Sequence, residues 1–224
     1  MDWQAVGLSL RLSMVTTAIL LVVGTPVAWW MATTRWRFLF LVEALAALPL
    51  VLPPTVLGFY VLIAIGPRSP LGAGWESITG RRLAFSFEGL LLASVLYSFP
   101  FAVQPVTAAF ARVDHRLLEA SWTLGVSRLE TFRRVVLPLS ARGIVAGSVL
   151  SFAHTLGEFG VVLMVGGNIP GRTRTVSISI YDSVQALEYA AAGRTALALL
   201  AVSFVVLAIT YGLQRRGEGM WPWS

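Results

Sequence analysis

Long apolar runs constrain this chain more than any other feature of its sequence. A helix that rises 1.5 Å per residue needs about 20 apolar residues to cross the core of a lipid bilayer. The sequence contains five such runs, at residues 12–31, 38–65, 89–110, 144–165 and 191–213. Only 12% of its 224 residues are charged and 56% are hydrophobic, whereas about 25% are charged in soluble domains. We therefore predict an all-α membrane protein, one transmembrane domain over 1–224 with about five transmembrane helices.

Two segments depart from a simple spanning helix. The run 38–65 is longer than one span needs and contains Pro49, Pro53 and Pro54, so we expect it to kink, tilt or leave the bilayer early. The segment 167–190 is amphipathic rather than uniformly apolar. A short surface helix, a re-entrant turn and a sixth span all remain open for it.

The distribution of arginine predicts the orientation in the membrane. The connections that follow the first, third and fifth runs contain more arginines than the connections on the other side. Because basic residues concentrate in cytoplasmic loops, this bias places the N-terminus outside, the C-terminus inside and the connection 111–143 in the cytoplasm.

The residue types that are absent exclude several kinds of chemistry. The chain has no lysine, and a Walker A loop needs a lysine for the nucleotide phosphates, so any ATP and Mg²⁺ would be bound by a separate subunit. Cysteine is also absent, and two histidines, His115 and His154, cannot form a zinc cluster. No Gly-x-Ser-x-Gly elbow is present. We predict that the chain is not an enzyme and contains no cofactor or metal of its own.

The predicted cytoplasmic connection contains signals for two short helices. Asp114 can cap a helix over 115–124, and Gly125 can end it in the left-handed conformation. Ser127 and Glu130 form a capping box for a second helix, which Pro138 would close. We call residues 114–138 the knob.

The knob permits two functional interpretations. Arg133 and Arg134 follow a glycine turn, as in a DNA-binding helix-turn-helix, where arginines contact phosphates. However, the knob lies between two membrane spans and has no dimerisation element to place it on a duplex. We therefore predict no nucleic-acid binding.

The second interpretation rests on a resemblance. The knob is similar to the coupling motif of ABC-importer permeases, in which Glu-Ala-Ala is followed after three residues by Gly and after nine more by Ile-x-Leu-Pro. Ser121 replaces the second alanine and Val135 the isoleucine, while the spacing agrees throughout. The resemblance implies that the first helix seats in a cleft of an ATPase subunit. It assigns ATPase coupling to Glu119, Ala120, Ser121, Gly125, Leu137 and Pro138.

A second stretch narrows the resemblance. Residues 154–175 and the pair Tyr181-Asp182 resemble the molybdate group of these permeases more than the sulfate and thiosulfate group. The resemblance implies a multi-pass protein of the cytoplasmic membrane that forms a homodimer with two ATPase subunits and an external oxyanion-binding protein. Tungstate and sulfate remain alternative substrates. An uncoupled channel or a secondary transporter is the alternative class, although no internal repeat of the kind common in secondary transporters is visible.

Several polar residues are candidates for the transport pathway. His154 and Glu158 lie four residues apart in the fourth run, which predicts one shared helix face, and ionisable groups inside a membrane are functional hypotheses by default. They can form a buried hydrogen-bonded pair or line the pathway. Hydroxyl, amide and guanidinium groups suit an oxyanion, although binding-protein contact is an alternative role for the loop arginines. The candidates for this polar cluster are Thr155, Asn168, Arg172, Thr173 and Arg174.

Small residues in the fourth run predict close helix packing. Gly143, Gly147 and Ser151 recur every four residues and therefore form one stripe. The stripe can serve packing within one subunit or across the two-fold axis of a homodimer.

Overall fold

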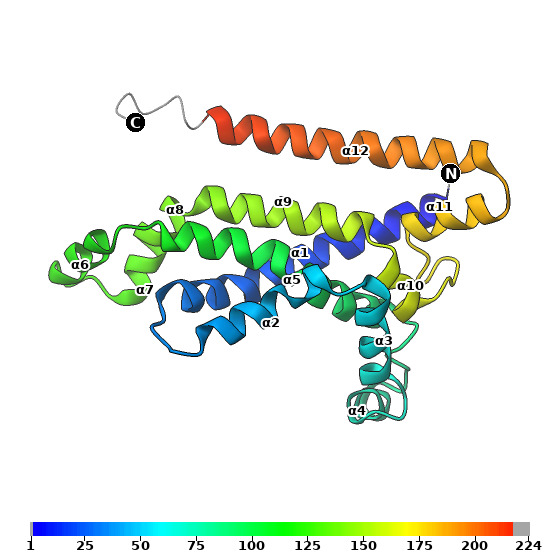
Figure 1. Ribbon diagram of the computed structural model, residues 1–224, viewed down its shortest axis with the longest axis horizontal. Helices are drawn as coiled ribbons and strands as arrows, with labels where there is room; N and C mark the ends of the chain where they lie inside the picture. The colour runs from blue at the N-terminus through cyan, green and yellow to red at the C-terminus, as the bar shows by residue number, and fades with distance from the viewer. Residues whose placement is uncertain (1, 217–224) are drawn as a thin grey trace.

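The computed structural model describes residues 2–216, and these form helices joined by short connections (Figure 1). Among the described residues, three helices are long and apolar enough to cross a membrane: α1 (Trp3–Thr33), α5 (Phe87–Ala111) and α12 (Tyr189–Arg216), in which the candidate span is Tyr189–Thr210. Two bent pairs of shorter helices raise the number of candidate spans in the described part of the chain to five.

The second apolar run is broken in two. Helices α2 (Leu39–Val51) and α3 (Pro54–Ile65) meet at an angle of 112°. Leu52 is extended because it precedes Pro53, and Pro54 then begins α3, where its missing N–H costs nothing. The short helix α4 (Pro70–Thr79) follows, and α3 and α4 together project from the body (Figure 1).

The fourth apolar run, predicted as a span over 144–165, is not one continuous helix. Helix α9 (Ala141–Gly157) ends where Glu158 becomes extended, with φ −64° and ψ 136°, and α10 (Gly160–Gly166) begins two residues later. Because of this break, α10 does not continue along the path of α9 and packs against α3. A Cβ atom on Gly160 would lie 2.6 Å from Pro54, so this contact requires glycine.

Helix α11 (Val176–Gln185) occupies most of the amphipathic segment 167–190. Its 10 residues are too few for a full span, and Val176 and Ile178 are buried. The backbone N–H of Val176 donates to Ser9 Oγ of α1 at 2.8 Å. The segment is therefore a short helix fixed to the body at the end opposite the knob (Figure 1).

Helix α5 lies at the centre of the body, where it packs against both α1 and α9, which also contact each other. The small-residue stripe of α9 packs against it: a Cβ atom on Gly147 would lie 2.7 Å from the carbonyl oxygen of Ala102. Ser151 is also fully buried. The stripe therefore packs helices within one chain.

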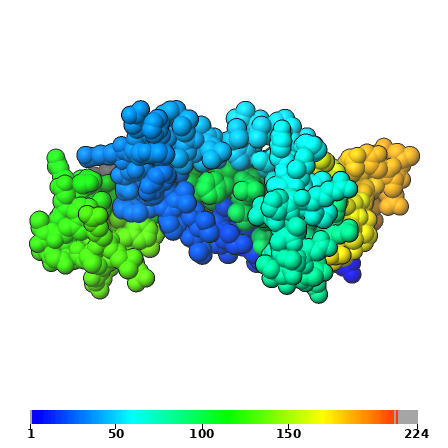
Figure 2. Space-filling model, turned by 90° about the horizontal axis from the view of Figure 1, so that it is seen from below, coloured from blue at the N-terminus to red at the C-terminus, as the bar shows by residue number. Residues whose placement is uncertain are grey.

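The knob forms one end of the molecule and is the green region at the left of Figure 2. It consists of α6 (His115–Thr123), α7 (Arg128–Thr131), the π-helical turn η1 (Phe132–Val136) and α8 (Leu137–Leu139). The helical path continues through Pro138 and ends at Leu139, one residue after the predicted closing proline. The wider π turn, in which the N–H of Leu137 donates to the carbonyl of Phe132, precedes the proline that lacks an N–H.

Candidate functional site

Helix α6 has well-defined ends, set by short-range interactions. The carboxylate of Asp114 accepts a hydrogen bond from the N–H of Arg116 at 2.9 Å. At the other end Gly125 has φ +79°, its N–H donates to the carbonyl of Trp122, and the N–H of Val126 donates to that of Ser121. This pair of bonds is a Schellman motif, which ends a helix with a glycine in the left-handed conformation.

A buried hydrogen bond joins the two halves of the knob. Ser121 Oγ of α6 lies 2.8 Å from Thr131 Oγ1 of α7, and both side chains are buried. The resemblance assigns Ser121 to ATPase coupling, but its side chain faces the interior of the knob. Its hydroxyl explains why serine, rather than alanine, can serve at this position.

The second half of the knob begins as predicted and differs in its side-chain pairing. Ser127 Oγ accepts from the N–H of Glu130 at 3.3 Å, which is the capping half of the predicted box. The carboxylate of Glu130 binds Arg134 at 2.8 Å. Leu137 packs against the core, while Pro138 is exposed.

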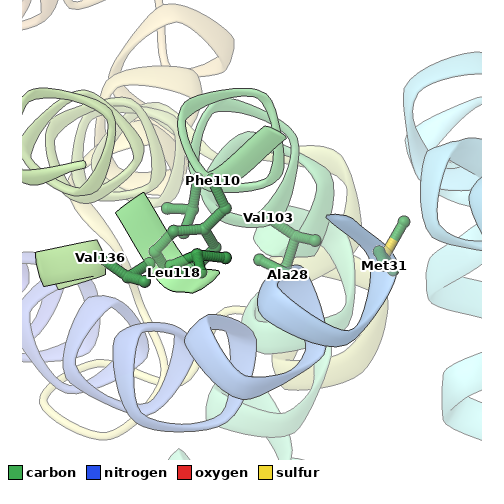
Figure 3. Close-up of a cluster of buried hydrophobic side chains, with 7 residues drawn as sticks. Ala28, Met31, Val103, Phe110, Leu118 and Val136 are labelled. Atoms are coloured by element: carbon green, nitrogen blue, oxygen red, sulfur yellow. The ribbon is translucent and has the colours of Figure 1, made fainter. Parts of the chain in front are cut away.

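The inner side of the knob is fixed to the long helices by an apolar cluster. Leu118 of α6 and Val136 of η1 meet Phe110 of α5 (Figure 3), and all three are at most 5% exposed. Ala28 of α1 and Val103 of α5 complete this contact. The knob therefore contacts α1 and α5 through buried apolar side chains.

The outer side of the knob leaves apolar and charged groups exposed. Leu124 is 82% exposed, Leu129 61% and Leu117 46%. Ala120 and Glu119 are also exposed, and Glu119 Oε1 lies 3.0 Å from His115 Nδ1. Several exposed leucines on one small projecting element are typical of a protein-binding surface.

A buried polar cluster surrounds the break in the fourth apolar run. Glu158 does not share a helix face with His154, because α9 ends before it, and the two side chains do not form the predicted pair. Each instead contacts a serine of α5. Ser94 Oγ donates to Glu158 Oε2 at 2.9 Å, and Ser98 Oγ lies 2.9 Å from His154 Nδ1.

The remaining contacts of this cluster also involve α5. Thr155 Oγ1 lies 2.8 Å from Ser98 Oγ, and the ring of His154 stacks on Phe101 with centroids 3.9 Å apart. Glu158 is 5% exposed, and its Oε1 has no hydrogen-bond partner among the described residues. Sequence reasoning missed Ser94 and Ser98, whose spacing of four residues in an apolar helix was the available signal.

The loop candidates for an oxyanion site do not come together as one. Asn168 Nδ2 donates to both carboxylate oxygens of Asp182, at 2.7 and 2.6 Å, and Asn168 Oδ1 accepts from Arg174 Nε at 2.6 Å. Thr173 is buried and donates to the carbonyl of Gly166 at 2.7 Å. These side chains shape the loop 167–175, and Thr155 belongs to the separate cluster on α5.

Arg172 lies apart from that network. It lines a cavity of about 450 Å³ together with Arg81, Arg82 and Trp75. Asp182 was not among the predicted site residues. Its role depends on a contact 14 residues away along the chain, which no local pattern indicates.

Comparisons with known proteins agree with this architecture. The family described as "Binding-protein-dependent transport system inner membrane component" matches residues 15–217. The "Molybdenum transport system permease protein ModB" of Azotobacter vinelandii is 49% identical over 219 residues, which cover 98% of this chain and 97% of that protein. The protein of the same name from Escherichia coli K12 is 36% identical over 96% of this chain and 94% of its own length.

A more distant relative, described as a probable sulfate transport system permease protein of Prototheca wickerhamii, is 28% identical over 91% of this chain and 79% of its own. A solved bacterial ABC transporter involved in import of the acidic polysaccharide alginate superposes with a TM-score of 0.77 at 17% identity, covering 95% of this chain and 78% of that one. The inward-facing MetNI methionine ABC transporter superposes with a TM-score of 0.72 at 17% identity, covering 96% of this chain and 95% of that one. The chain is therefore a multi-pass membrane protein that belongs to the family of binding-protein-dependent transport system inner membrane components.

Proposed function

We propose that this chain is the membrane-spanning permease subunit of an ATP-driven importer that carries molybdate across the cytoplasmic membrane. Relatives named as molybdenum permeases are 49% and 36% identical over almost the whole chain, whereas a relative named for sulfate is 28% identical. These identities favour molybdate over sulfate. Tungstate matches molybdate in charge and size and is the alternative substrate.

The observation that carries the coupling role is the two-sided structure of the knob. Its outer side exposes Leu117, Leu124 and Leu129, and its inner side is part of the buried cluster with Phe110. Burial of exposed apolar surface is worth about 25 cal/mol per Å², so a partner that covers these leucines gains affinity. The same partner would move α1 and α5 through the inner contact.

That partner is the ATPase subunit, which binds ATP and Mg²⁺ in place of this chain. Two ATPase subunits would bind two copies of the permease. Glu119, Ala120 and Gly125 lie on the exposed side of the knob and would touch or shape the contact. Ser121 and Leu137, which face inward, would hold the knob in place. With the knob inside, the N-terminus lies outside and an external binding protein delivers the oxyanion to the opposite end.

A second copy of the chain would cover the exposed face of α2. Helix α2 has no buried residue, and Leu45 and Val51 are 69% and 83% exposed. Glu43 is exposed on the same helix. A charged side chain that faces lipid costs about 2.5–3.5 kcal/mol on insertion scales, so a homodimer that covers α2 would be favoured.

The polar residues near the break have a positioning role in this proposal. His154, Thr155 and Glu158 hold α9 and the start of α10 against α5, and Asn168 and Thr173 shape the loop that follows. Among the loop candidates, only Arg172 lines the cavity that also contains Arg81 and Arg82. There it would face the arriving oxyanion or its binding protein.

Stimulation of the partner ATPase tests the substrate. The complex is reconstituted in nanodiscs, and ATP hydrolysis is measured with the cognate external binding protein loaded with molybdate, tungstate or sulfate. We expect molybdate-loaded and tungstate-loaded protein to stimulate hydrolysis and sulfate to have little effect. Stimulation by sulfate-loaded protein alone would contradict the substrate, and an assembled complex whose ATP hydrolysis no loaded binding protein stimulates would favour an uncoupled channel.

A further inference from the structure

A cavity of about 570 Å³ lies between the knob and the ends of the long helices. Trp29 of α1 and Phe110 of α5 form its inner wall, and Trp122 of α6 and Phe132 of η1 line the side toward the knob. The cavity thus lies at the joint through which the knob would act on the membrane helices.

Two arginines line this cavity, and the nearest carboxylate on its rim, that of Glu119, lies 3.0 Å from His115. Arg35, Arg128 and His115 line the cavity, and none of the lining residues is acidic. Arg128 lies over the ring of Trp122, with 5.6 Å from its guanidinium carbon to the ring centroid. Among the described residues, neither Arg35 nor Arg128 has a carboxylate within 4.0 Å. Two guanidinium groups are therefore available to an anionic ligand.

A hydroxyl group adds a further donor. Thr34 lines the cavity, and its Oγ1 accepts from the N–H of Trp36 at 3.4 Å. A hydroxyl that accepts one hydrogen bond keeps its own proton to donate. The guanidinium and hydroxyl groups can donate to a phosphate, and the aromatic wall can contact a hydrocarbon attached to it. The cavity therefore suits a phosphate with attached hydrocarbon better than a fully hydrated small anion.

The surrounding side chains place this cavity at the surface of the bilayer. Trp30 and Trp36 are 43% and 50% exposed, with ring centroids 6.3 Å apart, and Arg37 lies 4.5 Å from the ring of Phe38. Exposed tryptophans and arginines beside the end of a spanning helix mark the headgroup level. Basic pockets between membrane helices at this level bind anionic lipid headgroups.

We propose that this cavity binds the headgroup of an anionic phospholipid, with Arg35 and Arg128 on the phosphate and the aromatic wall beside the start of the acyl chains. The bound lipid would connect the α1–α2 loop to the knob and stiffen the joint between them. With the orientation proposed above, the lipid comes from the inner leaflet. The site itself does not depend on which oxyanion the protein transports.

Lipid binding to the intact complex with its ATPase tests this proposal. The complex in detergent is titrated with phosphatidylglycerol or with phosphatidylcholine, and retained lipid is counted by native mass spectrometry while the melting temperature is recorded. We expect retention and a raised melting temperature with phosphatidylglycerol only. A parent complex that retains both lipids equally contradicts the site before any variant is made.

Arg35→Gln is the test variant and Arg37→Gln is its matched control, because Arg37 belongs to the same loop and does not line the cavity. We expect Arg35→Gln to weaken phosphatidylglycerol binding about fivefold and Arg37→Gln to leave it unchanged. Equal effects of the two variants would overturn the proposal. If Arg35→Gln does not assemble, Arg128→Gln takes its place with the same expectation.

Two further arms identify the source of the anion. Inorganic phosphate or molybdate is added to the lipid-free complex at millimolar concentration. We expect neither to raise the melting temperature. If either ion raises the melting temperature of the parent complex and Arg35→Gln abolishes that increase, the cavity is a site for a free oxyanion and the lipid proposal is overturned. Neither arm measures transport, so failure here is distinct from failure of the proposed importer function.

Discussion

Ser94 of α5 donates a hydrogen bond of 2.9 Å to Glu158, 64 residues later, at the point where the fourth apolar run breaks. The bond is fully buried and connects the central helix to the extended residue that ends α9. It also explains why Glu158 is not part of a pair with His154, which contacts Ser98 one helical turn away. The position of the break is thus tied to α5.

This contact predicts different effects for two substitutions of Glu158. Glu158→Gln retains an oxygen that can accept from Ser94, so we expect a melting temperature close to that of the parent. Glu158→Leu leaves the hydroxyl of Ser94 buried without a partner, which costs about 1–3 kcal/mol. Thermal unfolding of the assembled complex measures both. Ser94→Ala in the Leu variant should recover part of the loss, and equal melting of the Gln and Leu variants would contradict this contact.

The turn at Gly125 predicts a conformational effect in the knob. A Cβ atom there would meet nothing within 4 Å, so only its φ of +79° opposes substitution. A β-branched residue in this conformation costs about 1–3 kcal/mol. We expect Gly125→Val to lose binding to the ATPase, while Gly125→Asn retains most of it because asparagine tolerates the left-handed region. Co-purification measures this, and equal binding by both variants would refute the role of the turn.

The packing of α9 on α5 predicts a steric effect. Gly147→Ala would place a Cβ atom 2.7 Å from the carbonyl oxygen of Ala102. Overpacking of this kind costs about 1–3 kcal/mol. Gly157→Ala is the control, because a Cβ atom at that residue of the same helix meets nothing within 4 Å. We expect only Gly147→Ala to lower the melting temperature. A smaller decrease in melting temperature for Gly147→Ala than for Gly157→Ala would show that α9 and α5 are packed differently.

The loop 167–175 predicts a division between its two arginines. Arg174 binds Asn168 and Asp182, whereas Arg172 is exposed on the cavity that contains Arg81. We expect Arg174→Gln to lower the melting temperature and Arg172→Gln to leave it unchanged while slowing uptake. Melting curves and uptake rates from the same preparations separate the two effects. Loss of stability in the Arg172 variant would place that residue in the structural network.

Local signals predict the caps and the turn of the knob well. Asp114, Gly125 and Ser127 act within a few residues of themselves, so their capping and turn roles can be inferred from sequence. The prolines at 53 and 54 likewise predicted a kink, which the bend between α2 and α3 confirms. The angle could not be inferred, because it depends on how α3 packs against α10.

The missed features all depend on distant contacts. The apolar pattern of 144–165 does not reveal a break, because its cause is the packing of Gly160 on Pro54 and the bond of Glu158 to Ser94. Asn168 and Arg174 are candidates for an oxyanion site by residue type, yet Asp182 pairs with both from a helix later in the chain. A polar side chain's type indicates what it can bind, and only the fold decides which partner it reaches.

Uptake of labelled molybdate into proteoliposomes tests the central claim most directly. The vesicles contain the permease with its ATPase, ATP is enclosed on the side of the knob, and the loaded external binding protein is added outside. The account predicts uptake that requires both ATP and the binding protein and that Gly125→Val abolishes although the variant remains folded. Uptake at the same rate without ATP, or undiminished in the Gly125→Val vesicles, would contradict it.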